Sequence, residues 1–365
     1  MKNQLSKYRR GIFVFIAISL IALFILFITS EMSFTTLKDS LKKFDNLICI
    51  PLAILFLLIH IVTDGLRLKL LASGMKDKLS LKESIKAGLA NEFLSAITPF
   101  QSGGQPLEIY VIHKAGISLG KSVVISYFKT ATNLFFLFTT GFFALLYYSS
   151  LTTLTYLNLF YVYGGLFITY FSIISYLSVF KPNFAKKLSY NILRFLRKIK
   201  IIKRNVFLSK VKFILREAKI FNHNIREYFF NRKGIIILVI LITFVVWSSK
   251  YLIAYFIALG LNINISIMEI LFYQSAIHFV NYSIPTPGAS GTSEFVAYSI
   301  FKFLSFTGFN STSGLASLNI YVVLWRFFTY HFIVILSGIV TFKILKDRVK
   351  ESKKITEELI QESES

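Results

Sequence analysis

The sequence contains few charged residues, very few acidic ones and a single cysteine. Only 16% of its 365 residues are charged, whereas ordinary soluble domains are about a quarter charged. The lone cysteine, Cys49, excludes an intramolecular disulfide and a cysteine-based structural zinc site. Because neither a His-x-x-x-His nor a Cys-x-x-Cys motif occurs, we expect no metal and no other cofactor. With 55% hydrophobic residues, the chain has no room for a large soluble catalytic domain.

Long apolar runs take up most of the chain. A bilayer span needs about 20 residues, and six runs approach or exceed that length: 11–29, 47–63, 122–147, 158–180, 234–259 and 317–342. The first follows a basic head and lacks a cleavage site, so it is expected to remain as a signal anchor. Two shorter segments, 85–97 and 267–284, end in Pro/Gly-rich stretches and predict broken helices that line a cavity or are shielded by protein. We therefore expect an all-α polytopic integral membrane protein with about six full spans plus two broken or re-entrant helix hairpins.

The distribution of positive charge predicts the orientation of these spans. Lys and Arg total 41 against 18 Asp and Glu, a formal net charge of +23. If the N-terminus is cytoplasmic, 34 of the 41 cations fall in the inner segments, which are 1–10, 65–86, 113–121, 181–233 and 343–365. The positive-inside rule favours this topology. We expect a multi-pass plasma-membrane protein of bacterial type with both termini cytoplasmic.

The two halves of the chain resemble each other when they are shifted by 186 residues. The aligned identities are Ala72/Ala258, Gly74/Gly260, Ser80/Ser266, Glu83/Glu269, Ala90/Ala276, Phe93/Phe279, Pro99/Pro285 and Glu108/Glu294. Each copy contains a span, a polar link, a short apolar helix, a Pro/Gly break and a glutamate. The topology above makes the copies run in opposite directions, so the prediction is an inverted repeat, a common transporter plan. Chance identity between apolar segments is the alternative.

The two breaks carry a resemblance to a known family. The first reads ITPFQSGGQPLE over 97–108 and the second IPTPGASGTSE over 284–294. With the WRFFTY element at 325–330 and the basic stretch between the halves, they resemble the flippase-like membrane domain of lysylphosphatidylglycerol synthase over essentially the whole chain. Many members have Gly-Glu followed by Arg after the first break. Here Gly104 is followed by Gln105-Pro106, and the acid is Glu108.

The resemblance implies movement of a phospholipid, such as lysyl- or another aminoacyl-phosphatidylglycerol, from the inner to the outer leaflet. Phospholipids are thus the expected partners, and a homodimer is left open. The chain ends at Ser365 without room for the soluble synthase domain, so we do not expect an enzyme, although the family can carry the label phosphatidylglycerol lysyltransferase. A membrane enzyme acting on lipid-linked substrates stays open, with Glu92, Glu108, His278 or Glu294 as acid or base.

The chain is expected to form one flippase-like membrane domain over 1–365. Its parts are a signal-anchor span and external link (1–46), a first half (47–180), a basic cytosolic amphipathic segment (181–233), a second half (234–342) and a charged cytosolic tail (343–365).

Six charges lie in or beside apolar segments: Glu92, Glu108, Glu294, Lys129, Lys250 and Arg326. Ionisable groups at membrane depth are costly and usually pair or line a cavity. Three structural ion pairs are one interpretation, and a polar path for a lipid is the other. In favour of the path, Gln274, His278 and Asn281 share one helical face, and the shift of 186 matches that face to Gly88, Glu92 and Ser95.

Other candidates come from the breaks, where helix N-termini favour a phosphate, although prolines and glycines also simply permit packing or kinks. The candidates in the breaks are Pro99, Gly103, Gly104, Pro285, Pro287, Gly288 and Gly291, and Asn133 in the run 122–147 is a further cavity-lining candidate. His60 and His331 are more typical of packed residues than of ligands. Asp64 and Arg67, near the expected inner surface, should pair with each other or with headgroups.

The segment 181–233 holds sixteen cations and only two acids, interleaved with apolar residues. Such a pattern predicts helices that lie on an anionic membrane surface. A cytosolic helical hairpin that covers the bundle is the alternative. Nucleic acid is not an expected partner, because the chain shows no recognisable nucleic-acid-binding fold.

Overall fold

The computed structural model describes residues 48–98, 101, 103–149, 183–198, 204–281, 286–289, 293–298 and 312–347, with scattered residues between 165 and 181. These residues are almost entirely helical, and no β-strand occurs among them, as the sequence predicts. The expected span 11–29, most of 158–180, and Pro99, Pro285 and Gly291 lie outside the described residues.

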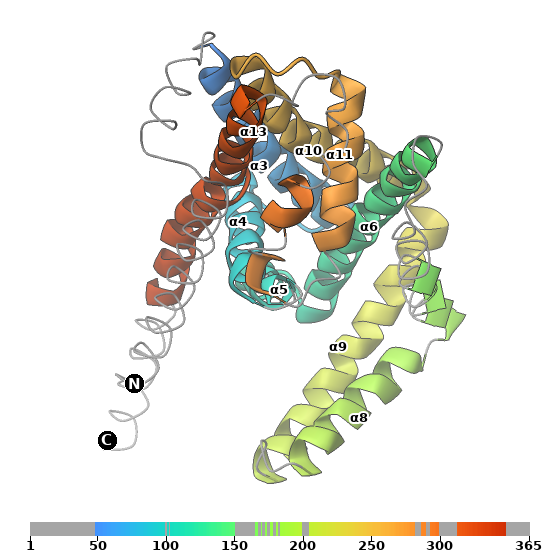
Figure 1. The fold of residues 1–365 in the computed structure, drawn as a ribbon. Coiled ribbons are helices and arrows are strands. Elements are labelled where there is room, and N and C mark those ends of the chain that lie inside the picture. Colours follow the sequence, from blue (N-terminus) through green and yellow to red (C-terminus); the bar gives the residue numbers. More distant parts are fainter. Residues whose placement is uncertain are drawn as a thin grey trace.

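Three described helices are long and apolar enough to cross a membrane (Figure 1): α3 (Cys49–Gly74), α10 (Lys233–Gly260) and the helix Ile320–Asp347. The third continues α13 (Thr312–Arg326) through a π-helical turn, η3 (Phe327–His331). A fourth long helix, α6 (Leu119–Ser149), covers the span predicted at 122–147. The described part of the chain is therefore that of an all-α, multi-pass membrane protein.

α3 is longer than the span predicted at 47–63. It continues through Asp64 and Arg67 to Gly74. These two residues are 7% and 1% exposed, and their side chains form an ion pair one turn apart. Because each charge is neutralised inside the protein, the helix does not need to end where the charged residues begin.

Short helices correspond to both segments that were predicted to break. α4 (Leu81–Ile97) ends just before Pro99, and α5 (Gly104–Lys114) follows. In the second half, α11 (Ile267–Asn281) precedes the short 3-10 turn η2 (Pro287–Ala289). α4 and α11 start with the same cap, in which a serine hydroxyl accepts from the N–H of a glutamate three residues on, at 3.2 Å in both Ser80/Glu83 and Ser266/Glu269.

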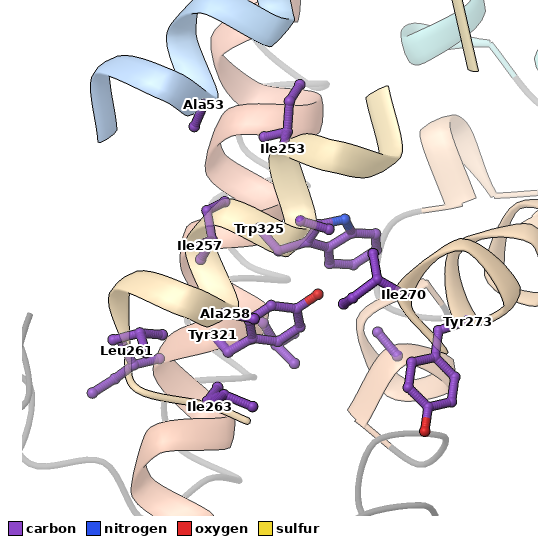
Figure 2. Packing of buried hydrophobic residues seen from close by; sticks show 14 of the residues in the cluster. Ala53, Ile253, Ile257, Ala258, Leu261, Ile263, Ile270, Tyr273, Tyr321 and Trp325 are labelled. Carbon is purple, nitrogen blue, oxygen red and sulfur yellow. The ribbon is translucent and has the colours of Figure 1, made fainter. Parts of the chain in front are cut away.

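α3 and α10 form an antiparallel pair at the centre of the bundle. Phe56 stacks on Phe256 with ring centroids 5.2 Å apart, near the start of α3 and the end of α10. At the opposite end, Gly74 lies against Ile235. An apolar core joins this pair to α11 and α13, and Figure 2 shows Trp325 and Tyr321 packed among its aliphatic side chains.

A helical hairpin of α8 (Phe184–Lys198) and α9 (Arg204–Asn231) lies beside the bundle (Figure 1). α9 anchors it, because the Glu217 carboxylate accepts from the Gly120 N–H at 2.7 Å and so caps α6. The Tyr228 hydroxyl donates to the Leu71 carbonyl of α3. Burial raises the pKa of Tyr228 above its ordinary value.

Candidate functional site

A polar cavity of about 140 Å³ lies between α3 and α10, and α4, α5, α6, α11 and the α13 helix complete its wall. Residues of all seven helices line it. The charged lining residues are Asp64, Arg67, Glu92, Lys129, Lys250 and Arg326.

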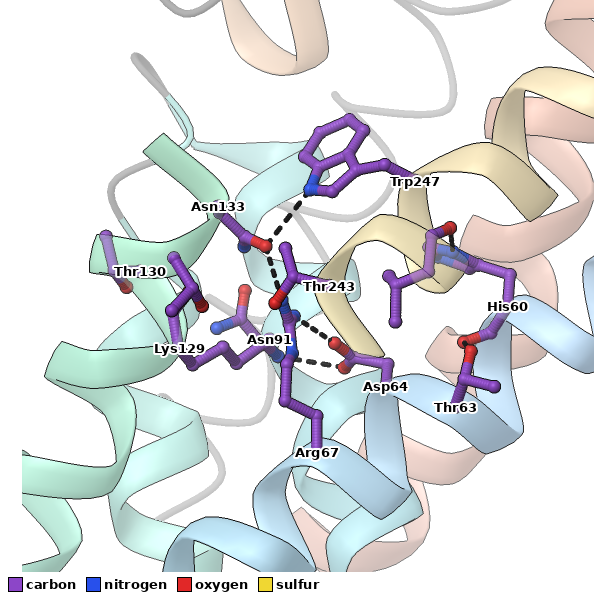
Figure 3. A network of polar contacts seen from close by, with 12 residues as sticks. His60, Thr63, Asp64, Arg67, Asn91, Lys129, Thr130, Asn133, Thr243 and Trp247 are labelled. Atoms are coloured by element: carbon purple, nitrogen blue, oxygen red, sulfur yellow. Dashed lines mark hydrogen bonds and ion pairs between the residues drawn. The ribbon is translucent and has the colours of Figure 1, made fainter. Parts of the chain in front are cut away.

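One side of the cavity is a buried network of alternating charges (Figure 3). The Asp64 carboxylate accepts from the Arg67 guanidinium and, at 2.9 Å, from Lys129. Lys129 also donates to Glu108 at 2.6 Å. Arg67 donates to the Thr243 hydroxyl at 3.1 Å. Two cations and two acids thus balance each other in a region where an isolated charge would be costly.

Neutral polar groups hold this network between helices. Asn91 of α4 donates to Glu108 at 2.9 Å. The side-chain oxygen of Asn133 on α6 accepts from Arg67 at 2.6 Å and from the Trp247 indole of α10 at 3.1 Å (Figure 3). The network therefore links α3, α4, α5, α6 and α10 and fixes the positions of its charges.

A second ion pair lies at the break of the second half. Arg326 donates to the Glu294 carboxylate and to the Gly288 carbonyl, each at 2.7 Å. Its guanidinium lies over the Tyr330 ring, 3.9 Å from the centroid. Gly288 has φ 58°, and a Cβ there would lie 2.0 Å from the Tyr330 hydroxyl oxygen. Glycine thus allows the break to pack against the π-helical turn, a helix distortion frequent at functional sites.

Two charged lining residues, Glu92 and Lys250, attract each other electrostatically but have no oppositely charged partner of fixed sign within 4.0 Å among the described residues. The Glu92 side chain is 38% exposed, and its ion-pair neighbour is the His60 ring at 3.9 Å. Lys250 lies 5.7 Å from the Trp247 ring centroid. Within the described ranges, no carboxylate lies within 4.0 Å of the Lys250 ammonium group.

The polar face predicted on α11 does point inward. His278 and Asn281 line the cavity, whereas Gln274 lies behind it and accepts from the Trp325 indole at 3.1 Å. The Nε2 of His278 and the Oδ1 of Asn281 have no hydrogen-bond partner among the described residues. On the matching face of α4, Glu92 and Ser95 also line the cavity.

Comparison with known proteins identifies the family. The family model described as lysylphosphatidylglycerol synthase transmembrane region matches residues 14–337, most of the chain. The chain belongs to this family. A UPF0104 membrane protein from Archaeoglobus fulgidus is 27% identical over 349 residues, covering 93% of this chain and 97% of the relative. No solved structure matches the chain.

In this family member, most predicted site residues with described side chains lie at the cavity or directly behind it. Those that line it are Glu92, Lys129, Asn133, Lys250, His278, Asn281, Gly288 and Arg326. Glu108, Gln274 and Glu294 lie behind them, bonded to Lys129, Trp325 and Arg326.

The remaining predicted site residues belong to the breaks. Gly103 donates its N–H to the Thr98 hydroxyl at 2.8 Å. A Cβ on Gly104 would lie 2.5 Å from the Asn91 carbonyl, so the start of α5 packs directly on α4. Pro287 begins η2. None of these three residues lines the cavity, although their neighbours Gln105 and Gly288 do.

Sequence reasoning placed Asp64 and Arg67 near the inner surface and so missed their place in the cavity wall. The predicted pairing of the two residues is confirmed, but both line the cavity. His60 does so as well, with its Nδ1 3.0 Å from the Val246 carbonyl. The leucines that follow Asp64 could have indicated a longer helix. No sequence signal indicated Asn91 or Trp247. Among the described residues, no group of three His, Cys, Asp or Glu could hold a metal.

Proposed function

We propose that this protein is a lipid translocase that moves a phospholipid headgroup between leaflets through the cavity between α3 and α10. The observation that carries the proposal is the cavity itself, whose wall and backing hold four cations and four acids among helices long enough to span a bilayer. A headgroup cannot cross hydrocarbon without losing its hydration. Fixed charges of both signs along a path replace part of that hydration.

The distribution of the carboxylates supports transport over chemistry. Glu108 and Glu294 each have a cation within 2.7 Å, an arrangement suited to holding charges in place. Glu92 is the exception, because it faces the cavity and lies 3.9 Å from His60. This pair keeps a membrane enzyme acting on a lipid-linked substrate as the second candidate, with Glu92 as acid or base.

We further propose that the two halves form an inverted repeat with about six spans and two broken hairpins. Its first support is the equivalence of helix ends at positions that differ by 186. α3 and α10 end at Gly74 and Gly260, and α4 and α11 begin at Leu81 and Ile267. The links between them share a residue with positive φ, 60° at Lys76 and 54° at Asn262.

The packing of α3 on α10 supports the same proposal. His60 contacts Val246, and these positions also differ by 186. When equivalent residues of two antiparallel helices touch, a local two-fold axis passes between them. Repeats related by an axis in the membrane plane have this property, and their substrate sites lie at the interface between the repeats.

We propose the orientation that the charge pattern predicts. In this orientation the basic links 65–86, 113–121 and 181–233 and both termini lie on the cytoplasmic side. In support, the links lie together: Lys121 at the start of α6 bonds to Asp77 at 2.8 Å, and α9 contacts the ends of α3 and α6 through Tyr228 and Glu217. The expected location of this cytoplasmic face is the inner surface of the plasma membrane.

The exposed side of α8 suits an anionic membrane surface. The helix Phe184–Lys198 contains five Lys and Arg residues and no acid, and its apolar residues Leu188, Ile192 and Phe195 are exposed. Apolar residues can enter the headgroup region while each nearby cation contributes about 1 kcal/mol of attraction to anionic lipid. We propose that α8 rests on the inner leaflet beside the bundle.

A vesicle assay tests the proposed translocation. The full chain is reconstituted with fluorescent phospholipids, and a membrane-impermeant quencher reports how fast inner-leaflet lipid becomes accessible. We expect transfer by the parental protein and slower transfer by Lys250→Gln, with Lys233→Gln on the exposed start of α10 as the matched control. Transfer at the protein-free rate would contradict the proposal. If the protein turned over a lipid-linked substrate and Glu92→Gln abolished this turnover, the result would favour the enzyme.

A further inference from the structure

Charge is divided unequally between the two halves of the cavity. The first half contributes three acids against two cations, and the second contributes one acid against two cations. The first set is Asp64, Glu92, Glu108, Arg67 and Lys129, and the second is Glu294, Lys250 and Arg326. Counting only these acidic and basic residues, the first half has a net charge of −1 and the second a net charge of +1.

Once the ion pairs are taken into account, one charged residue without a described ion-pair partner of fixed sign remains in each half of the cavity. Asp64 and Glu108 share Lys129, Arg67 also pairs with Asp64, and in the second half Glu294 pairs with Arg326. Glu92 remains on α4, and Lys250 remains on α10. Both line the same cavity, yet the described structure holds no ion pair within 4.0 Å between them.

We propose that the cavity selects a zwitterionic phospholipid, with its phosphodiester at Lys250 and its ammonium group at Glu92. This inference rests on the proposed function, because it names the lipid class that the translocase would carry. Charge-assisted hydrogen bonds to both groups are stronger than bonds between neutral partners. The phosphodiester would pair with Lys250 and the ammonium group with Glu92, the two charges that have no ion-pair partner of fixed sign within 4.0 Å in the described structure.

Two further lining residues have hydrogen-bonding groups without a partner among the described residues. Asn281 is 3% exposed, and its Oδ1 is a buried acceptor without a donor in the described part of the chain, which a nearby ammonium group would satisfy. The Nε2 of His278 is likewise without a partner, and its ring lies 5.2 Å from the Trp247 ring, on which Lys250 rests. As an N–H donor, this nitrogen can add to phosphate binding.

The volume and the net charge of the cavity define the class of lipid headgroup further. A cavity of about 150 Å³ holds a benzene-sized group, so 140 Å³ suits a headgroup and not acyl chains. Phosphatidylglycerol brings a phosphate without an ammonium group, which leaves Glu92 unpaired. Lysyl-phosphatidylglycerol brings one ammonium group too many. Either mismatch leaves an uncompensated charge at membrane depth, which disfavours binding.

Native mass spectrometry of the full chain tests the proposal by lipid binding, without reference to transport. The protein is reconstituted into nanodiscs that contain equal amounts of phosphatidylethanolamine, phosphatidylglycerol and lysyl-phosphatidylglycerol, and is then released for measurement with its bound lipids. We expect phosphatidylethanolamine to be retained about tenfold over phosphatidylglycerol, as one charge-assisted hydrogen bond permits. Glu92→Gln should shift the preference toward phosphatidylglycerol, and Lys250→Gln toward lysyl-phosphatidylglycerol. Lys250→Arg should keep the parental preference.

Matched controls separate selectivity from folding. Glu83→Gln on α4 and Lys233→Gln on α10 change the same charges on the same helices outside the cavity, and should leave the preference unchanged. Equal retention of the three lipids by the parental protein, or variants that fail to shift in opposite directions, would overturn the inference. If a single variant unfolds, the double variant Glu92→Gln/Lys250→Gln, which keeps the cavity neutral, is measured in its place. Loss of the lipid preference in the double variant would support the inference, and an unchanged preference would overturn it.

Soluble glycerophosphoethanolamine distinguishes a lipid from a free headgroup. We expect it to displace bound phosphatidylethanolamine only in large excess, and displacement at equal concentration would overturn the lipid assignment. The two proposals fail separately. Retained phosphatidylethanolamine without leaflet transfer would remove the translocase function but support the selectivity, whereas transfer without headgroup preference would remove only the selectivity.

Discussion

The ammonium group of Lys129 lies 2.6 Å from the carboxylate of Glu108, and both side chains are at most 8% exposed. α6 and α5 are thereby joined through a buried charge pair. Removing one partner of such a pair leaves the other charge buried and uncompensated, although here Asp64 also contacts Lys129.

The first prediction is that Glu108→Gln lowers the free energy of unfolding by about 3–5 kcal/mol, the usual cost of breaking a buried pair. Glu83→Gln is the control, because Glu83 pairs with Lys86 where both side chains are 34% exposed, and such pairs contribute about 0.2–1 kcal/mol. Thermal unfolding in detergent compares the two. Equal melting temperatures for both variants would show that the ion pair between Glu108 and Lys129 does not stabilise the fold.

A second prediction concerns the break of the second half. Gly288→Ala places a Cβ 2.0 Å from the Tyr330 hydroxyl oxygen at a residue with φ 58°. The variant should lose about 1–3 kcal/mol of stability, because backbone strain adds to the clash. Gly234→Ala is the matched control, since no atom lies within 4 Å of its added Cβ. A melting temperature for Gly288→Ala equal to that of the control would refute the packing described.

Inverted topology gives a third prediction through two equivalent links. Lys78 and Asn264 differ by 186 positions, and both side chains are exposed. In a Cys49→Ala background, single cysteines at these positions should react with an impermeant thiol reagent from opposite sides of the membrane. Labelling of both from the same side would exclude an inverted repeat.

The position of α8 can be followed at Ile192, which is 50% exposed on a helix without acids. An environment-sensitive fluorophore on Ile192→Cys, in the Cys49→Ala background, should shift to the blue in anionic vesicles and less so in neutral ones. High salt should reduce the shift, because electrostatic attraction to the leaflet is screened. A spectrum independent of lipid charge would leave α8 as a cytosolic cover only.

The long helices and the short broken ones could be predicted from sequence, because apolar runs and Pro/Gly stretches mark them directly. The partners of the cavity charges could not. Three matched pairs were a natural expectation, yet Lys250 has no described acid within 4.0 Å, whereas Lys129 contacts two. Pairing depends on the rotation and depth of packed helices, which hydropathy does not encode.

Two local features also lacked a sequence signal. α3 continues beyond its apolar run because Asp64 and Arg67 neutralise each other inside the bundle, a contact that depends on tertiary packing. The π-helical turn Phe327–His331 itself contains neither proline nor glycine, so nothing in the pattern marks it. Both features contribute residues to the cavity, where local sequence rules are most often overridden.

The most direct test of the account blocks the cavity and measures leaflet transfer. Ser95 lines the cavity, whereas Ser73 on α3 is exposed outside it. In the Cys49→Ala background, Ser95→Cys and Ser73→Cys are each labelled with a bulky thiol reagent in vesicles that contain fluorescent phosphatidylethanolamine. We expect labelling to stop transfer by Ser95→Cys and to leave transfer by Ser73→Cys unchanged. Undiminished transfer by fully labelled Ser95→Cys would contradict a lipid path through this cavity.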